Sequence, residues 1–284
     1  MTGSSEVAYS GEPGAFAEDA AIAAFGDVAR IGLPGFREVF EAVAGGRVVA
    51  GVLPIENLVG GTIRETYDLL LEHGPAIVGE VVVPVRLCLA ALPGQRLEEI
   101  ERVYSHVQAL GQAERFLRTQ SWTLLTTYNT AGAGRIVAER RETGAAALLS
   151  PRAAETFGLE ILADGVQDVA DNRTRFLVVT PAGGAGSLPE WQAPRSEARR
   201  TMLVFGVRNQ PGTLLGALRV FAERGVNLSK LESRPSRERA WEYVFWADLD
   251  AGVEDPVCAA AIDELRGEAT MVRVLGSHPR SRDD

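Results

Sequence analysis

The chain has 284 residues, of which 46% are hydrophobic and 24% are charged, so it is long enough for one large or two modest folded domains. Its net charge of −9 argues against nucleic acid and acidic membranes as partners, and an anionic ligand must therefore be held by local groups. Two cysteines and three histidines without ligand spacing predict neither a disulfide framework nor a metal site, and the lack of a signal-peptide pattern or a long apolar stretch favours a cytoplasmic protein.

The first residues alternate a short strand with amphipathic helices. Val7–Tyr9 predicts a strand, and Phe16–Phe25 and Phe36–Ala44 predict helices with one apolar face each. The turn between the strand and the first helix contains Gly11 and Gly14. Such a junction presents backbone N–H groups to an anion, although ordinary turn chemistry explains these glycines equally well.

A buried strand predicted at Val48–Ile55 runs directly into Glu56 and Asn57. Polar groups at the end of an apolar strand lie where open α/β sheets place their sites. The next helix, predicted at Ile63–Glu72, has its own N-cap in Thr62. Glu56 and Asn57 are therefore candidates for orienting a ligand.

The middle of the chain repeats the order strand, polar N-cap, helix. This order predicts mostly parallel sheets covered by helices, arranged as two lobes around a cleft. The predicted strands are Ala76–Val83, Val85–Leu92, Arg102–Ser105, Trp122–Thr127 and Ala145–Leu149; the predicted helices are Gln108–Thr119, Ala131–Arg141 and Pro151–Phe157, which follow the caps His106, Asn129 and Ser150.

The segment Asp171–Thr180 (DNRTRFLVVT) returns to the first lobe and ends in a buried strand. At its start, the hydroxyl of Thr174 stands between Arg173 and Arg175. Two guanidinium groups beside a hydroxyl suit a small anion such as a carboxylate. The alternative is a polar turn in which both arginines are solvated.

The residues after this strand change in character. Pro181–Arg200 is rich in Pro, Gly and Ser and predicts a linker. The order strand, helix, strand, strand, helix, strand that follows is the ferredoxin-like unit. Its predicted elements are Thr201–Val207, Gly212–Arg224, Val226–Glu232, Glu242–Leu249, Pro256–Arg266 and Thr270–Leu275.

Four motifs, taken in order, resemble the prephenate dehydratase family, and a fifth resembles the ACT regulatory domain fused to that enzyme. The resemblance extends from Ala8 to about Gly276. The four are PIENLVGGT (Pro54–Thr62), SHVQALGQ (Ser105–Gln112), YNTAGA (Tyr128–Ala133) and VQDVADNRTRFLVV (Val166–Val179), and the fifth is NQPGTLLGALRVFAERGVNLSKLESRP (Asn209–Pro235).

The elements and the resemblance together predict an α/β chain with a two-lobed, periplasmic-binding-protein-like catalytic domain and a βαββαβ ACT domain. We expect the catalytic domain at residues 5–182, with lobe one at about 5–80 and 160–182 and lobe two at about 81–159. A linker at 183–200 then leads to the ACT domain at 201–278.

The resemblance implies a lyase that removes water and carbon dioxide from prephenate to give phenylpyruvate, the step before phenylalanine, without a cofactor. It implies that Thr174 donates a proton to the departing hydroxyl and that Arg175 holds a carboxylate. The other substrate-binding residues that it implies are Phe176, Asn172, Glu56, Asn57, Ser105, His106, Gln108, Thr130 and Ala131.

For the ACT domain, the resemblance implies feedback regulation by L-phenylalanine at an interface between two copies, and hence a dimer or tetramer. Gly212 allows close backbone approach at a helix start, which suits a carboxylate, although it also serves as a plain turn residue. The implied effector residues are Asn209, Pro211, Gly212, Thr213, Leu214, Ala217, Leu218, Asn227, Leu228, Glu232, Ser233 and Arg234.

Other functions remain open at this point. The family more often has Ser at Leu58 and Pro at Val107, and TAGA at Thr130–Ala133 resembles versions that accept arogenate. A non-catalytic amino acid sensor would share the architecture but has no use for Thr174. Related chains that decarboxylate prephenate without dehydrating it lack both this threonine and the ACT domain.

Overall fold

The structure is a computed structural model that describes residues 6–183, 188–236 and 243–282. It divides into two compact units. Unit 1 comprises Met1–His73, Val81–Pro181 and Ala185–Ala193, and unit 2 comprises Gly74–Glu80, Ala182–Gly184 and Pro194–Asp284. Within the described ranges, no helix has the length and apolar character needed to cross a membrane.

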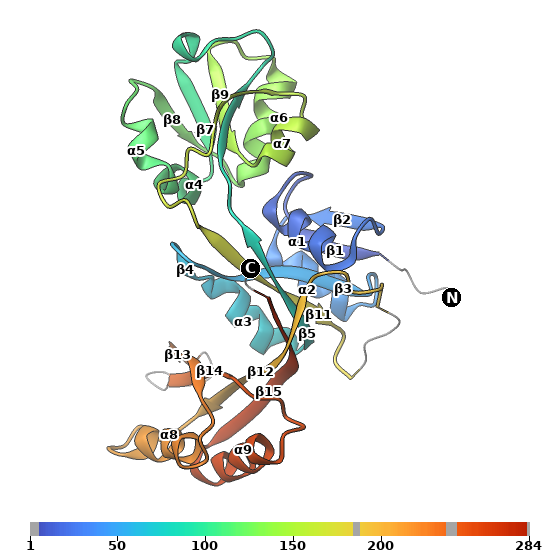
Figure 1. Cartoon of the computed structure of the whole chain (residues 1–284), viewed down its shortest axis with the longest axis vertical. Coiled ribbons are helices and arrows are strands. Elements are labelled where there is room, and N and C mark those ends of the chain that lie inside the picture. Colours follow the sequence, from blue (N-terminus) through green and yellow to red (C-terminus); the bar gives the residue numbers. More distant parts are fainter. Residues whose placement is uncertain (1–5, 184–187, 237–242, 283–284) are drawn as a thin grey trace. The chain divides into compact units, whose positions relative to one another are not determined.

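Lobe one of unit 1 is built on a mixed sheet with the strand order β2-β1-β3-β11-β5, and β4 pairs with β3 (Figure 1). Strands β1, β2 and β3 are parallel, whereas β11 runs antiparallel to β3. The elements are β1 (Val7–Ser10), α1 (Phe16–Phe25), β2 (Arg30–Leu33), α2 (Phe36–Ala44), β3 (Ala50–Asn57), β4 (Gly61–Thr62), α3 (Arg64–His73), β5 (Ala76–Pro84), of which residues 81–84 belong to unit 1, and β11 (Arg173–Thr180).

The pairing of β3 with β11 brings together two motifs that lie far apart in the sequence. Thr174 is the register partner of Asn57, and Arg175 is the register partner of Glu56. The strands can pair here because the first six residues of β3 and the last five of β11 are buried and apolar or small enough to pack in the core.

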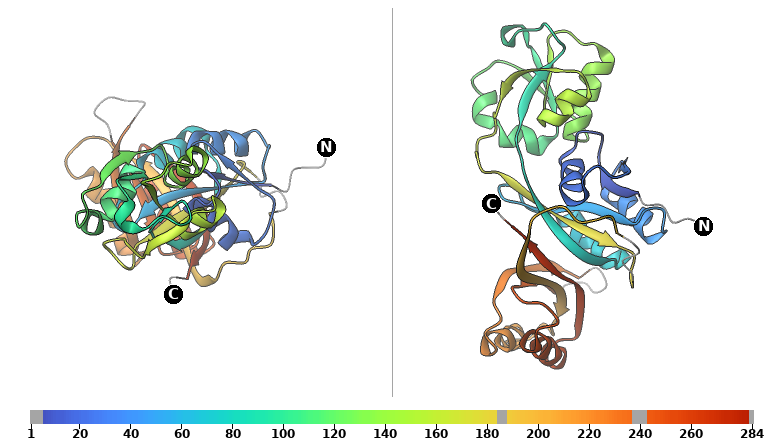
Figure 2. Two further views of the ribbon diagram at one scale, coloured as in Figure 1. Left: turned by 90° about the horizontal axis from the view of Figure 1, so that it is seen from above. Right: turned by 45° about the vertical axis from the view of Figure 1, so that its right-hand side comes forward.

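Lobe two is a second mixed sheet, with the order β10-β6-β9-β7-β8, and it is the green and yellow-green part of Figure 2. Strands β7, β8 and β9 are parallel, while β6 and β10 are antiparallel to their neighbours. The elements are β6 (Cys88–Ala91), a 3₁₀ turn (Leu97–Glu99), β7 (Arg102–Ser105), α4 (Val107–Gln112), α5 (Glu114–Leu117), β8 (Thr123–Thr126), α6 (Thr130–Arg140), β9 (Ala145–Leu149), α7 (Pro151–Thr156) and β10 (Glu160–Asp164).

Side chains of β9 alternate between the two faces of this sheet. Ala146 and Leu148 join one buried cluster, with residues of α4 and α5, whereas Ala145, Ala147 and Leu149 join another, with residues of α6 and α7. Helices therefore cover both faces, as the strand-helix order predicts.

Three local predictions for unit 1 require correction. The helix predicted at Gln108–Thr119 is two short helices, because Ala113 leaves the helical region with φ −122° and ψ 26°. The sheets are mixed and not mostly parallel, because β11 runs antiparallel to β3, and β6 runs antiparallel to both of its neighbours, β9 and β10. Strand β10 lies where only a connecting segment was expected.

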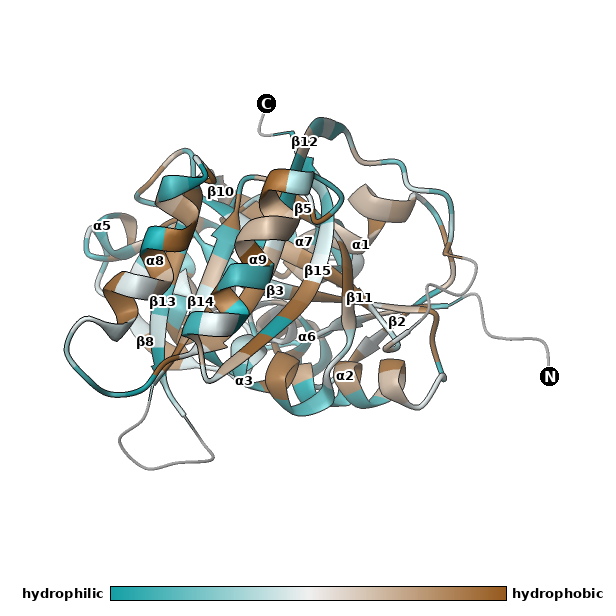
Figure 3. Cartoon of the chain, turned by 90° about the horizontal axis from the view of Figure 1, so that it is seen from below, coloured by the Kyte–Doolittle hydropathy of each residue, from teal (hydrophilic) through white to brown (hydrophobic). Residues whose placement is uncertain are grey.

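Unit 2 contains the predicted βαββαβ order in a sheet arranged β13-β14-β12-β15. The amphipathic character of α8 and α9 is visible as teal and brown bands in Figure 3. In α9, the buried side chains Cys258, Ala261, Ile262 and Leu265 recur at helical spacing and pack on the sheet. The elements are β12 (Arg195–Gly206), α8 (Thr213–Glu223), β13 (Leu228–Pro235), β14 (Tyr243–Leu249), α9 (Pro256–Glu268) and β15 (Met271–Ser281).

The predicted linker is shorter than expected at its C-terminal end. Strand β12 begins at Arg195, which pairs in register with Ser281. The preceding residues pack on lobe one, because Trp191 contacts Phe25 edge to face at 5.5 Å between ring centroids. Residues 184–187, also within the predicted linker, lie outside the described part of the chain.

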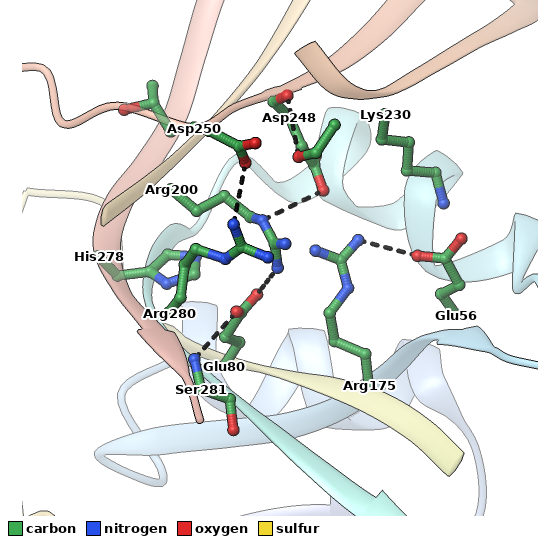
Figure 4. A network of polar contacts seen from close by, with 12 residues as sticks. Glu56, Glu80, Arg175, Arg200, Lys230, Asp248, Asp250, His278, Arg280 and Ser281 are labelled. Atoms are coloured by element: carbon green, nitrogen blue, oxygen red, sulfur yellow. Dashed lines mark hydrogen bonds and ion pairs between the residues drawn. The ribbon is translucent and has the colours of Figure 1, made fainter. Parts of the chain in front are cut away.

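A buried ionic cluster stabilises unit 2 (Figure 4). Arg200 donates to Glu80 at 2.5 Å and lies 3.8 Å from a carboxylate oxygen of Asp248. The second oxygen of Glu80 accepts from the backbone N–H of Ser281 at 3.1 Å. All three ionic side chains are buried, so Arg200 offsets part of the cost of burying the two carboxylates.

Candidate functional site

A cavity of about 620 Å³ lies in unit 1, lined by residues of both lobes. Several of its polar residues come from the ends of parallel strands and the starts of the helices that follow, which is where open α/β sheets bind ligands. From lobe one these include Ser10, Asn57, Thr62 and Thr174; from lobe two they include His106, Gln108, Gln112, Asn129, Thr130 and Ser150.

Thr174 lines this cavity and is hydrogen-bonded to Asn57. The amide Nδ2 of Asn57 donates to Oγ1 of Thr174 at 2.9 Å. Since Oγ1 accepts this bond, the hydroxyl proton of Thr174 is left to be donated elsewhere. The threonine can therefore act as a proton donor toward a group in the cavity.

The other contacts of Asn57 hold its amide in one orientation. Its Oδ1 accepts from the backbone N–H of Gly60 at 2.7 Å and of Val59 at 3.1 Å. Its Nδ2 also lies 2.9 Å from Oδ1 of Asn172 and 3.1 Å from the carbonyl oxygen of Arg173. If the amide were flipped, its Nδ2 would face the N–H groups of Val59 and Gly60, which are also donors. The hydrogen-bond network therefore requires that Nδ2 is the atom that faces Thr174.

Arg175 and Glu56, both expected at the substrate, do not line the cavity. The guanidinium donates to the Glu56 carboxylate at 3.1 Å (Figure 4), and its side chain is 10% exposed. Neighbouring side chains on a strand point to opposite faces, so Thr174 and Phe176 face the cavity while Arg175 faces away.

Two further predicted residues also lie behind the cavity wall. Ser105 is buried, and its Oγ donates to the carbonyl oxygen of Leu148 at 2.6 Å, which ties β7 to β9. Asn172 is buried beside Asn57, and its Nδ2 has no hydrogen-bond partner among the residues that the structure describes. Both can support the site without lining the cavity.

Four predicted residues of lobe two do line the cavity: His106, Gln108, Thr130 and Ala131. His106 is the N-cap of α4, and its Nδ1 accepts from the backbone N–H of Gln108 at 3.3 Å. Burial lowers the pKa of His106 below its usual value of 6.5. The imidazole is therefore neutral at pH 7, with the proton on Nε2.

Three helices begin at the cavity wall. Helices α1 and α2 begin at its wall, after Ala15 and Gly35, and neither N-cap makes a side-chain capping bond. Helix α6 begins there too, with Asn129 capping only the N–H of Gly132. The cationic side chain that lines the cavity is Arg64. Helix N-termini with uncapped N–H groups attract anions.

The two lobes also touch directly at the cavity wall. The hydroxyl of Ser150 donates to the carbonyl oxygen of Gly14 at 2.7 Å. Gly14 has φ 85°, and a Cβ there would lie 2.4 Å from Cα of Ala153. A glycine is thus required for this close approach between the lobes, a role that the sequence analysis did not foresee.

Several residues that line the cavity were not singled out by the sequence interpretation, among them Tyr128 and Gln112. The side chain of Tyr128 is 79% exposed. Gln112 donates from Nε2 to Oδ1 of Asn57 at 3.3 Å. Both lie inside motifs that the sequence analysis quoted, YNTAGA and SHVQALGQ. The motifs therefore contained the signal, but these two positions were not assigned a role.

The predicted effector residues all lie in unit 2, on the loop before α8, on α8 itself and around β13. Gly212 is the N-cap of α8 with φ 87°, and Thr213 donates to the carbonyl oxygen of Arg208 at 2.6 Å. Asn227 donates to Asp250 at 2.7 Å. Strand β13 is at one edge of its sheet.

Comparison with known proteins gives a consistent family assignment. The model of the prephenate dehydratase family matches residues 7–183, and the model of the ACT domain matches residues 201–267. A relative named arogenate dehydratase/prephenate dehydratase 2, chloroplastic, from Arabidopsis thaliana is 40% identical over 283 residues, which is 96% of this chain and 72% of that protein.

Two solved structures are also similar over almost the whole chain. Prephenate dehydratase from Arthrobacter aurescens, in complex with L-Phe, has a TM-score of 0.85 and 31% identity, covering 98% of this chain and 90% of that one. A chain described as GqqA, a novel type of quorum quenching acylases, has a TM-score of 0.86 and 33% identity, covering 97% of this chain and 98% of that one.

Proposed function

The chain belongs to the prephenate dehydratase family and has a C-terminal ACT domain, and from this premise we propose that the cavity of unit 1 is its active site, with Thr174 as the proton donor. The enzyme is a lyase that converts prephenate to phenylpyruvate in phenylalanine biosynthesis and is regulated by phenylalanine. The observation that carries the residue assignment is the hydrogen bond from Asn57 to Thr174 Oγ1, which leaves the hydroxyl proton for the substrate.

The reaction is an elimination whose electrons all come from the substrate. The bond between the ring and its carboxylate breaks to release carbon dioxide, and its electron pair moves into the ring. The C–O bond at the opposite carbon breaks, and the leaving hydroxyl takes up a proton to depart as water. Donation from Thr174, or a strong hydrogen bond from it, stabilises the charge that develops on this oxygen.

The two substrate carboxylates require positive potential in a chain whose net charge is −9. Because Arg175 is paired with Glu56 and lies outside the cavity wall, backbone N–H groups at the starts of α1, α2 and α6 are better placed to receive them. Arg64 adds a full charge at the same wall. Arg175 then serves to hold the corner where β3 meets β11.

Arogenate is the alternative substrate, and it differs from prephenate by carrying an ammonium group where prephenate carries a keto group. Glu65 lines the cavity and could receive such a cation. The two departures from the family pattern do not line the cavity: Leu58 is 67% exposed and Val107 is 61% exposed. The preference therefore rests on residues such as Thr130 and Ala131, which do line it.

Phenylalanine binding at the ACT domain would be coupled to self-association. Strand β13 lies at the edge of its sheet, where a strand of a second copy can pair with it, and it carries Leu228, Glu232, Ser233 and Arg234. A ligand bound between two copies can bias a dimer or tetramer between two states. Light scattering with and without phenylalanine tests this assembly, and a monomer under both conditions would exclude it.

A cytoplasmic location suits the two cysteines, Cys88 and Cys258, which are both buried and unpaired with one another. Nothing in the proposed reaction calls for a metal or a cofactor, because the substrate supplies the electrons.

One assay set separates the candidate functions. The purified protein is incubated with prephenate, and phenylpyruvate is followed by its absorbance in alkali; arogenate is tested in parallel, and both assays are run with and without phenylalanine. Turnover of prephenate or arogenate supports a dehydratase. Phenylalanine binding without any turnover would identify an amino acid sensor.

A further inference from the structure

Strand β5 is shared by the two compact units. Its residues up to Glu80 belong to unit 2, whereas its residues from Val81 onward belong to unit 1, where the strand lies beside β11 in the sheet of lobe one. We propose that β5 couples unit 2 to the cavity, and that Glu80 is the residue through which unit 2 holds this strand. Phenylalanine bound in unit 2 acts on the proposed active site by way of β5.

Unit 2 holds its part of β5 at two points. The carboxylate of Glu80 accepts from Arg200 of β12 at 2.5 Å and from the backbone N–H of Ser281 of β15 at 3.1 Å (Figure 4). Near the start of the strand, β15 passes so closely that a Cβ on Gly276 would lie 2.1 Å from the carbonyl oxygen of Ile77. Glu80 and Arg200 are both buried, so water cannot readily replace either partner.

The other end of β5 leads to the cavity. Val85, the residue after the strand, donates its backbone N–H to the carbonyl oxygen of Asn172 at 2.7 Å. The side chain of Asn172 accepts from Asn57, which also donates to Thr174. Val85 and Leu87 themselves line the cavity. A shift of this strand along its axis therefore moves both a part of the cavity wall and the network that orients the proton donor.

An extended strand can transmit such a shift. From Glu80 to Val85 the chain spans about 17 Å, and all but the last of these residues belong to one uninterrupted strand. Because an extended backbone is close to its greatest possible length, a pull at one end displaces the other end and does not stretch the chain between them. Strands β12 and β15, which hold Glu80, are part of the sheet of unit 2. A ligand that prefers one arrangement of this sheet thus biases the position of β5.

This inference rests on the proposed function, and its test measures coupling as well as activity. The quantity is the factor by which saturating phenylalanine changes kcat/KM for prephenate, measured with the full chain. Glu80→Gln keeps an oxygen for one of the two donors, and Glu80→Leu keeps none. We expect the factor to come about 3- to 10-fold closer to 1 in the Gln variant, the range of one lost hydrogen bond, and closer still in the Leu variant.

Two further measurements show that only the coupling has changed. Activity without phenylalanine should remain native in both Glu80 variants, because β5 keeps its place beside β11. Binding of phenylalanine, measured by calorimetry, should also remain. If the Leu variant does not fold, the Gln variant decides the test.

Asp248→Asn is the matched control. Asp248 is a second buried carboxylate beside Arg200, at 3.8 Å, but it lies on β14 and not on β5. This variant should therefore keep the native phenylalanine factor. An equal loss of coupling in Asp248→Asn would show a general loosening of unit 2 and overturn the inference. So would native coupling in the Glu80 variants, or a loss of phenylalanine binding in them.

The unmodified chain separates failure of this inference from failure of the proposed function. If it turns over neither prephenate nor arogenate, the proposed function fails, and this inference fails with it. If it turns over substrate at a rate that phenylalanine leaves unchanged, regulation through unit 2 is refuted while the catalytic assignment stands. If phenylalanine regulates the native chain and the Glu80 variants equally, only the role of Glu80 and β5 is refuted.

Discussion

Oγ1 of Thr174 lies 2.9 Å from Nδ2 of Asn57, although 117 residues separate the two in the sequence. They are register partners on strands β11 and β3, and both line the cavity. The direction of this bond matters as much as its length, because the oxygen of the threonine accepts and its proton remains to be given away. The strand pairing of lobe one thus sets up the chemistry of the site.

Removing the hydroxyl tests the proton donor directly. Thr174→Ala should lower kcat by about 10²- to 10⁴-fold, or about 3–5 kcal/mol in the barrier, because the leaving oxygen loses its acid. Thr174→Ser keeps the hydroxyl and should retain most of the activity. Steady-state kinetics with prephenate measures both, and an Ala variant with near-native turnover would remove Thr174 from the mechanism.

Reversing the Asn57 bond gives a second test that leaves the shape of the site unchanged. In Asn57→Asp, a carboxylate oxygen replaces Nδ2, so the Thr174 hydroxyl donates to it and no longer to the substrate. The other carboxylate oxygen can still accept from Val59 and Gly60, and the Asn172 amide can turn its Nδ2 toward the new oxygen. The carbonyl oxygen of Arg173 then faces an acceptor, so we expect a modest loss of stability with the fold preserved. We expect kcat to fall about 10²-fold, with an unchanged circular dichroism spectrum as the control. A variant as active as the native chain would contradict the donor assignment.

Local rules predicted much of the fold. Ser150 caps α7 with Pro at its first position, and Asn129 caps α6, both as expected from N-cap chemistry. The predictions failed where the structure depends on residues that are distant in the sequence. Strand β10 is half exposed and has no clear apolar alternation, so its partner β6 makes it a strand. The break at Ala113 has no local signal, because alanine favours helix.

In the site, too, local chemistry was predicted and the direction of a side chain was not. Arg175 was expected at the substrate because a guanidinium can bind a carboxylate. Its direction follows from the alternation of side chains along β11, which places Thr174 and Phe176 on one face and Arg175 on the other. Its partner Glu56 comes from β3, and no local pattern connects two residues 119 positions apart.

The state of His106 predicts a pH dependence. Burial lowers its pKa below 6.5, so the unfolded chain takes up the proton at a higher pH than the folded chain does. The contribution of this group to stability is complete above pH 6.5 and decreases as the pH falls below it. Protonation also converts Nδ1 from acceptor to donor and breaks its bond to Gln108.

Activity should therefore be constant near neutral pH and fall on the acidic side, at a pH below the usual histidine range. His106→Asn preserves an N-cap acceptor but cannot titrate, so the acidic limb assigned to this residue should disappear from its pH–kcat profile. If the acidic limb of the profile is unchanged in this variant, a group other than His106 causes it.

Tyr128 should contribute to substrate binding from the cavity mouth. Its side chain is 79% exposed, yet it lines the cavity and its hydroxyl comes within 3.6 Å of the position that a Cβ on Gly35 would occupy. An aromatic ring between the lobes can cover a bound six-membered ring. Tyr128→Ala should raise KM about 5- to 10-fold with a smaller change in kcat, since a ring contact contributes about 0.5–1.5 kcal/mol. Tyr128→Phe separates the ring from its hydroxyl, and a native KM in the Ala variant would exclude both.

The ionic cluster of unit 2 predicts unequal effects for its two main partners. Arg200 is the cation between Glu80 and Asp248, all of them buried. Arg200→Met removes the cation that contacts two buried carboxylates and should destabilise the chain by about 3–5 kcal/mol. Glu80→Gln should cost less, because Arg200 keeps Asp248 as a partner and the glutamine oxygen can still accept from Ser281. Urea unfolding of both variants measures the difference.

The double variant provides the control. If charge determines the effect, adding Glu80→Gln to Arg200→Met should recover part of the lost stability. A double variant that is less stable than Arg200→Met alone would show that packing and not charge determines the order.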